Sequence, residues 1–139
     1  MPTLTRGQHI HLVGIGGAGL SAIARVLLGQ GYRVSGSDRS LNDMTAALAR
    51  DGAQITQGHA AANIAGADAL IITSAVQPDH VEVAAAYAAG IPVYKRQDIM
   101  ADLMRGQRVI GVAGTKGKTT TTAMIAHILL DCGRDPSYI

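Results

Sequence analysis

The feature that most restricts the fold of this chain is a glycine-rich loop that occurs twice, each time between a β-type run and a helical pattern. The first loop, residues 14–19, follows the apolar run 9–13 and precedes apolar residues at helical spacing over 20–28. The second loop, residues 111–119, follows a β-type run over 108–113 and leads into a helical pattern from 118 to about 131. Units of this kind are typical of α/β folds, in which helices cover a parallel sheet.

The segment between the two loops alternates short β-type runs with helical patterns. We predict strands at 32–35, 53–56, 67–73 and 93–94, and helices at 42–50, 81–89 and 98–104. This order predicts an α/β, Rossmann-like, doubly wound parallel sheet with helices on both faces. The polar stretch 105–107 predicts a boundary between a first domain, residues 1–106, and the truncated start of a second, residues 107–139. Residues 137–139 resemble the start of a further strand, so we expect a piece of a longer protein.

Charge and composition argue against several classes of function. The chain has 139 residues, with 12 Lys and Arg against 10 Asp and Glu and no long block of one sign, which argues against nucleic-acid and membrane partners. No apolar run approaches the roughly 18 residues of a membrane span. The single cysteine, Cys132, excludes an intrachain disulfide and a cysteine-based metal cluster, and it favours a reducing, cytoplasmic compartment.

The first loop matches the pattern G-x-G-x-x-G through Gly14, Gly16 and Gly19. Glycines let the backbone approach a diphosphate, and the amides and positive end of the following helix stabilise its charge. Asp38, about 20 residues further on, falls where a ribose hydroxyl is met in dinucleotide-binding folds. We therefore predict a nucleotide diphosphate site; the alternative is that these glycines only permit close packing of helix on strand.

The second loop resembles the phosphate-binding pattern G-x-x-x-x-G-K-[ST] but departs from its spacing. Gly117, Lys118 and Thr119 fit its end, whereas Val112 occupies the position of its first glycine. Backbone amides of such a loop hold phosphates, the lysine reaches the terminal phosphates and the hydroxyl binds Mg²⁺. We predict ATP and Mg²⁺ as cofactors here, with Lys118 and Thr119 as the catalytic pair and Thr119 as the metal ligand.

Five segments taken together resemble the Mur ligase family across nearly the whole chain. They are HLVGIGGAGLSAIARVL, VSGSD, IITSAV, GIPVYKRQDIMADLM and GVAGTKGKTTTTAMIAHIL, in the family's order. The resemblance implies a domain for the UDP of the substrate, a central ATPase and a third domain for the amino acid. It is strongest to the member that joins L-alanine to the carboxylate of UDP-N-acetylmuramate through an acyl phosphate, in peptidoglycan precursor synthesis. The murein-peptide recycling ligase, which uses the same sugar nucleotide, remains an alternative.

The resemblance also implies which positions bind substrate and ATP. For the UDP-sugar these are Gly14, Gly16, Gly17, Ala18, Gly19, Ser37, Asp38, Ser74 and Ala75. Two further substrate contacts, His59 and Arg96, are predicted from their places in loops after strands; a solvated arginine is the alternative for Arg96. For ATP the positions are Gly114, Thr115, Lys116, Gly117, Lys118, Thr119 and Thr120. Lys116 departs from the family, which usually has His there in alanine-adding members.

Two other classes of function fit part of the pattern. The first loop and Asp38 alone would suit an NAD(P)-dependent oxidoreductase or a regulatory dinucleotide-binding domain, but such proteins have no need of Lys118 and Thr119. A phosphate-loop ATPase without ligase chemistry is the second. We expect this chain to bind the UDP-sugar and to catalyse nothing alone. Its second unit should join the first sheet, pair with another copy as a homodimer, or be disordered, and His9 and His11 should lie at the entrance of a strand.

Overall fold

A five-stranded parallel sheet organises the first of two compact units in this computed structural model, which describes residues 3–139. The first unit ends at Arg105 and the second begins at Gly106. The strand order is β3-β2-β1-β4-β5, and every pairing is parallel. The strands are β1 (His9–Val13), β2 (Arg33–Asp38), β3 (Gln54–Gln57), β4 (Ala69–Ile72) and β5 (Val93–Lys95). This order confirms the predicted doubly wound sheet, and all the carboxyl ends lie along one edge.

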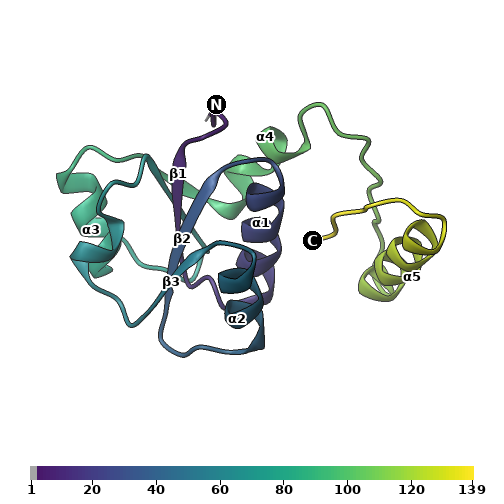
Figure 1. Cartoon of the computed structure of the whole chain (residues 1–139), viewed down its shortest axis with the longest axis horizontal. Coiled ribbons are helices and arrows are strands. Elements are labelled where there is room, and N and C mark those ends of the chain that lie inside the picture. Colours follow the sequence, from purple (N-terminus) through teal and green to yellow (C-terminus); the bar gives the residue numbers. More distant parts are fainter. Residues whose placement is uncertain (1–2) are drawn as a thin grey trace. The chain divides into compact units, whose positions relative to one another are not determined.

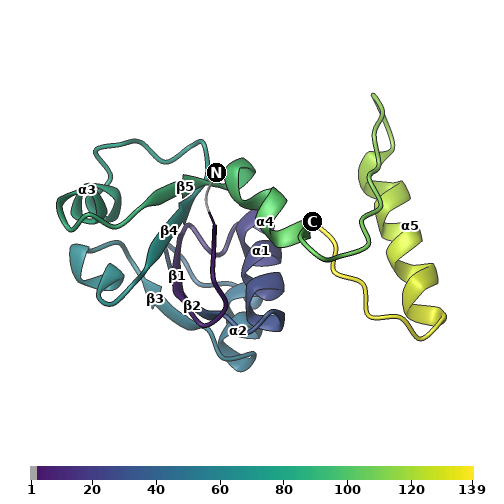
Figure 2. The same ribbon diagram turned by 90° about the horizontal axis from the view of Figure 1, so that it is seen from above.

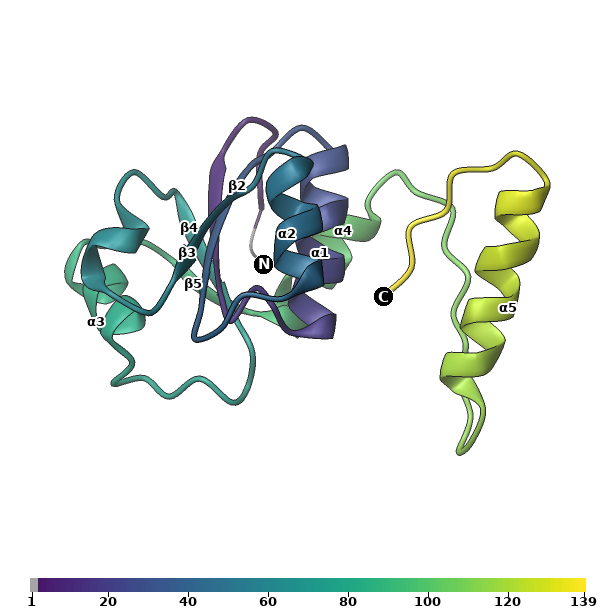
Figure 3. The ribbon, with the colours of Figure 1, turned by 60° about the horizontal axis from the view of Figure 1, so that its bottom comes forward.

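Helices cover both faces of this sheet (Figures 1 and 3). On one face lie α1 (Ala18–Gly29) and α2 (Asp43–Arg50), followed later in the chain by the 3₁₀ turn η2 (Arg96–Ile99) and α4 (Met100–Met104), which Figure 2 shows beside α1. On the other face lie the 3₁₀ turn η1 (Ala61–Ile64) and α3 (Val81–Ala88). No helix in residues 3–139 combines the length and apolar character that crossing a bilayer requires.

The two faces of the sheet differ in how apolar they are. Toward α1, Ile10 and Leu12 of β1 are fully buried against Ile23 and Leu27. Toward α3, an apolar cluster gathers over the half of the sheet formed by the end of β1 and by β4, with Leu70 at its centre. The other half of that face, over β1 and β2, carries polar side chains under η1 and α3. The polar half adjoins the candidate site described below.

Strand β2 runs three residues further than the sequence predicted. The predicted end at residue 35 is wrong, since Gly36 pairs with Leu12 inside the sheet. A Cβ added at Gly36 would lie 2.5 Å from Cδ1 and 2.7 Å from Cβ of Ile15, which is fully buried. Tertiary packing therefore overrides the poor strand propensity of glycine, because only glycine leaves room for Ile15 against the strand.

Replacing Gly36 by alanine is expected to lower the free energy of unfolding by about 1–3 kcal/mol, because Ile15 must shift in a closely packed site. Urea denaturation followed by far-ultraviolet circular dichroism measures the change. The matched control is Gly29→Ala in the last turn of α1, where an added Cβ meets nothing within 4 Å. That variant should be neutral or more stable by up to about 1 kcal/mol. Equal stability of the two variants would contradict the packing argument.

The second unit contains one regular element among its described residues, α5 (Lys118–Asp131), which matches the predicted helix. The strand predicted over residues 108–113 is absent, and so is the one predicted to start at 137–139. None of the five strands of the sheet comes from residues 106–139, so the first of the three arrangements expected for this unit, joining the first sheet, is not found. Pairing with another copy and disorder stay predictions. The physical reason is that a strand needs a hydrogen-bonded neighbour, and Val109 and Ile110 remain 55% and 61% exposed.

Candidate nucleotide-binding site

The loop between β1 and α1 is anchored to the backbone of β2 at the carboxyl edge of the sheet. The amides of Gly14 and Ile15 both donate to the carbonyl of Ser37, at 2.8 and 3.1 Å, and the amide of Gly17 donates to the carbonyl of Gly14 at 3.1 Å. Gly14 has φ of 85°, a backbone conformation that glycine adopts without strain. The loop lies beside the point between β1 and β4 where the strand order reverses, which is where doubly wound sheets bind ligands.

Two positive groups meet at the first turn of α1. No side chain caps this helix, so its first amides, beginning at Ala18, are free to bind an anion. The guanidinium of Arg96, from the segment after β5, lies against Gly19: a Cβ added there would be 2.6 Å from Nη1. Within residues 3–139 no acidic side chain forms an ion pair with Arg96. An uncapped helix start beside an unpaired guanidinium is a site suited to phosphate.

Asp38 and Asn42 fix the shape of the loop from the side of α2. Oδ2 of Asp38 accepts from the amide of Gly16 at 2.8 Å, and Nδ2 of Asn42 donates to the Gly16 carbonyl at 3.0 Å. A Cβ added at Gly16 would lie 2.9 Å from that carboxylate oxygen, so glycine permits the approach. One oxygen of Asp38 is therefore committed to the loop. The other is 3.3 Å from the amide of Ser40 and lies in a partly exposed side chain.

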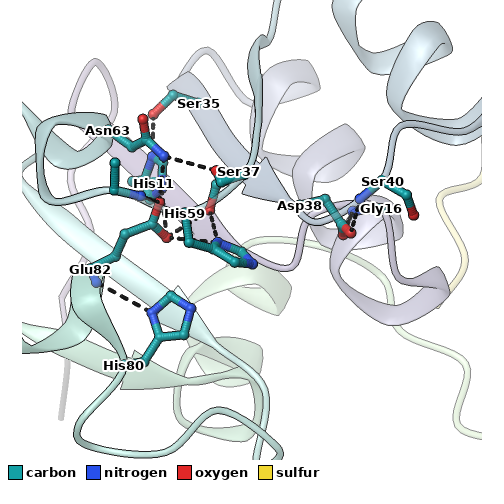
Figure 4. A network of polar contacts seen from close by, with 12 residues as sticks. His11, Gly16, Ser35, Ser37, Asp38, Ser40, His59, Asn63, His80 and Glu82 are labelled. Carbon is teal, nitrogen blue, oxygen red and sulfur yellow. Dashed lines mark hydrogen bonds and ion pairs between the residues drawn. The ribbon is translucent and has the colours of Figure 1, made fainter.

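A fully buried carboxylate, Glu82, lies behind this edge in the first turn of α3 (Figure 4). Its Oε2 accepts from Oγ of Ser37 at 2.6 Å, and its Oε1 accepts from Nδ2 of Asn63 at 2.6 Å and from the amide of Ala60 at 3.4 Å. Nε2 of His11 lies 3.6 Å from Oε2. Sequence reasoning did not identify Glu82, because a glutamate near a helix start ordinarily faces solvent.

The predicted substrate contact His59 packs against the buried Ser37 and Glu82. Its Nδ1 lies 2.9 Å from Oγ of Ser37 and 3.4 Å from Oε2 of Glu82, and its side chain is 18% exposed. The ring packs edge-to-face on His80, with centroids 4.6 Å apart. Nδ1 of His80 accepts from the amide of Glu82 at 3.3 Å. Ser37, also predicted to meet the substrate, is fully buried, so its hydroxyl supports His59 and is not open to a ligand.

The polar side chains continue under α3 to the amino end of β1. Oγ of Ser35 lies 2.8 Å from Nδ1 of His11 and 2.7 Å from Nε2 of His9, whose Nδ1 lies 2.9 Å from the carbonyl of Gly66. His11 is 1% exposed, so its predicted place at the entrance of the strand is wrong. A signal was present in the sequence: polar residues at alternate positions of two neighbouring strands share one face of the sheet.

The network sets the charge of Glu82. Burial alone would raise the pKa of Glu82, but the adjacent His11 ring and the hydrogen bonds from Ser37 and Asn63 favour the carboxylate and lower this pKa to about 2. Glu82 is therefore ionised at neutral pH. Burial, and then the nearby His59, lower the pKa of His80, which keeps that ring neutral.

His59, His80 and Glu82 bring potential metal-ligand atoms within 4.8 Å of one another, a spacing at which they could hold a metal ion. Nδ1 of His80 already accepts a backbone amide, and Nδ1 of His59 faces Ser37. Both carboxylate oxygens of Glu82 accept hydrogen bonds as well. The nitrogens that hold these rings in place are thus used within the protein, and the group is better described as a hydrogen-bonded network.

The second loop turns at two glycines before an uncapped helix. Gly114 and Gly117 have positive φ, 155° and 77°, and no side chain caps α5. Nζ of Lys118 donates to the carbonyl of Gly114 at 2.7 Å, so the lysine folds over its own loop. All the residues predicted to bind ATP are exposed: Gly114, Thr115, Lys116, Gly117, Lys118, Thr119 and Thr120. In the first unit, Ser74 and Ala75 form an exposed turn after β4.

Comparison with known proteins decides the family. Residues 9–108 match the Mur ligase family, catalytic domain. The chain belongs to the Mur ligase family. This Mur ligase chain is 55% identical over 132 residues to the UDP-N-acetylmuramate–L-alanine ligase of Roseiflexus sp. (strain RS-1). The matched segment makes up 95% of this chain and 28% of that relative. It therefore spans less than a third of the length of this relative.

Solved structures of two family members share the fold. The UDP-N-acetylmuramate–alanine ligase of Thermotoga maritima superimposes with a TM-score of 0.83 at 38% identity, over 90% of this chain and 30% of that one. A murein peptide ligase from Psychrobacter arcticus gives a TM-score of 0.82 at 32% identity, over 91% of this chain and 27% of that one. The fold is thus common to both kinds of ligase, while the more identical relatives are alanine-adding ones.

Proposed function

We propose that this chain binds the UDP-sugar and the ATP of a ligase that joins L-alanine to the carboxylate of UDP-N-acetylmuramate, in peptidoglycan precursor synthesis. We propose the ligation itself for a protein of the length of its relatives. Names and identities of those relatives support the reaction. The single observation that carries the binding proposal is the uncapped start of α1 beside the unpaired guanidinium of Arg96, at the switch point of the sheet.

In this proposal the first loop holds the diphosphate of the UDP-sugar. The amides at Ala18 and Gly19 donate to phosphate oxygens, and Arg96 adds charge-assisted hydrogen bonds from the opposite side. Oδ1 of Asp38, whose one hydrogen bond is the 3.3 Å contact from the Ser40 amide, and the ring of His59 lie on the side of β2 and β3, where the nucleoside would meet them. Residues 74–75 would close the side of β4.

The second loop would hold the phosphates of ATP. The uncapped start of α5 and the positive-φ glycines fit that role, and Lys118 would exchange its bond to the Gly114 carbonyl for a terminal phosphate. A bound Mg²⁺, held through Thr119, would neutralise charge on the transferring group. The muramate carboxylate takes the terminal phosphoryl group of ATP, and the L-alanine amine then displaces phosphate from the acyl phosphate. Lys116 would add a further cation beside the triphosphate.

Calorimetric titration of the purified chain with UDP-N-acetylmuramate tests the binding proposal. Arg96→Ala should weaken binding by about 10- to 100-fold, because hydrogen bonds to charged groups contribute about 1.5–3 kcal/mol. The control Arg25→Ala removes an exposed arginine of α1 and should leave the affinity unchanged. A separate titration with NADH addresses the dinucleotide alternative. Binding of NADH without binding of the sugar nucleotide, or equal affinity of both arginine variants, would overturn the assignment.

A further inference from the structure

The buried polar half of the sheet can be assigned proton by proton. A carbonyl oxygen only accepts, so Nδ1 of His9 carries the hydrogen that it donates to Gly66. If His9 is neutral, its Nε2 must accept, and the hydroxyl of Ser35 donates to it. Oγ of Ser35 then accepts from Nδ1 of His11. Each step follows because a hydroxyl has one hydrogen to give.

This series of hydrogen bonds leaves two acceptor atoms facing each other at His11. A neutral ring with its hydrogen on Nδ1 would present the lone pair of Nε2 to a carboxylate oxygen of Glu82 at 3.6 Å, so two acceptors would face each other. Nε2 of His11 is buried and has no other hydrogen-bond partner in the described residues. Two acceptors in contact without water are costly, and an added hydrogen on Nε2 removes the conflict.

The added proton can sit on either imidazole with the same result at Glu82. With His11 doubly protonated, Ser35 donates to His9; with His9 doubly protonated, Ser35 donates to His11. In both arrangements a hydrogen on Nε2 of His11 points at Glu82. The neutral carboxylic acid is disfavoured because Ser37, Asn63 and the amide of Ala60 all donate into Glu82.

The tautomer of His59 follows from its hydrogen bond with Ser37. The hydroxyl of Ser37 gives its hydrogen to Glu82 at 2.6 Å, so its oxygen can only accept from Nδ1 of His59. Nδ1 of His59 therefore carries a hydrogen, and Nε2 of the neutral ring is left as an acceptor. The groups that face His11 and Glu82 are His9 and Ser35 from the sheet, His59 and Asn63 from the segment after β3, and His80 from the start of α3.

We propose that the hydrogen-bonded series His9–Ser35–His11 carries one proton more than it would with both imidazoles neutral, and that this positive charge forms an ion pair with Glu82. Because ionised Glu82 accepts the hydrogen of Ser37, Ser37 in turn fixes His59 as the Nδ1–H tautomer, with Nε2 as an acceptor for the ligand. Glu82 and Ser37 are positioning residues, and His59 selects a nucleoside that offers an N–H or O–H donor. This part rests on the proposed function. The protonation states do not, because they belong to the free protein.

Nuclear magnetic resonance of the ¹⁵N-labelled chain without ligand, near pH 7, tests the assignment. The two-bond correlations of each imidazole distinguish the two tautomers from the doubly protonated ring. We expect His59 as Nδ1–H, and a doubly protonated ring at either His9 or His11. His127, an exposed histidine of α5, serves as the internal reference. An Nε2–H tautomer at His59, or neutral rings at both His9 and His11, would overturn the proposal.

Two variants separate positioning from mere folding. Glu82→Gln should remove the extra proton from the histidine pair; persistence of that proton in a folded variant counts against the ion pair. Ser37→Ala should release the fixed tautomer of His59 and weaken binding of UDP-N-acetylmuramate by about 3- to 10-fold. Thr56→Ala, an exposed cross-strand neighbour of Ser37, should do neither. If the wild-type tautomer is as assigned but no sugar nucleotide binds, the proposed function fails; if it binds and Ser37→Ala matches Thr56→Ala, the positioning role fails.

Discussion

Replacing Glu82 by leucine is expected to lower the free energy of unfolding by about 3–5 kcal/mol, the usual cost of removing one partner from a buried ion pair. The substitution leaves the hydroxyl of Ser37, the amide of Asn63 and Nε2 of His11 without a partner inside the protein. Urea denaturation followed by far-ultraviolet circular dichroism measures the loss.

The control for this variant is Asp43→Leu. Asp43 also lies in the first turn of its helix, α2, but its side chain is exposed. It should cost no more than about 1 kcal/mol, the range of an exposed charge near a helix start. If the two leucine variants are equally stable, the network under α3 contributes nothing beyond the helix start, and the stabilising role of Glu82 is refuted.

Acidification is expected to remove the stabilisation that comes from ionised Glu82. Its folded pKa of about 2 lies below the ordinary value of 4.5, so this contribution is complete above pH 4.5 and is lost as the pH falls toward 2. A difference of this size corresponds to about 3 kcal/mol. Other carboxylates also titrate in this range, so the informative quantity is the difference between the wild-type chain and Glu82→Gln. That difference should shrink between pH 5 and pH 2, whereas parallel curves would show that Glu82 does not titrate with folding.

The sheet and its order of elements could be predicted because they follow from local patterns. Apolar runs such as 67–73 and the helical spacing of 20–28 need no knowledge of distant partners. The two glycine loops were likewise placed correctly between an apolar run and a helix, although the first of those runs is a strand and the second is not. What the sequence indicated well was therefore the order of the elements, while the edge at which a ligand binds stays a prediction.

The misjudged features all depend on contacts between distant segments. Gly36 looks like a strand end until Ile15 is seen packed against it. Val109 and Ile110 have strand propensity, but a strand forms only beside another. Glu82 and His11 come within 3.6 Å of each other only because α3 packs over β1. The proposed roles of the individual site residues remain predictions, now with a geometry against which they can be tested.

The contact between Arg96 and Gly19 joins the first helix of the sheet to the segment that follows its last strand. A phosphate bound by both would therefore link two segments from opposite ends of the first unit. Its binding energy would be felt by the cooperative unfolding of the whole sheet and not by fraying of one loop, because the grip exists only when all five strands are assembled. The site would thus report on complete folding, so that only a finished sheet could hold the nucleotide.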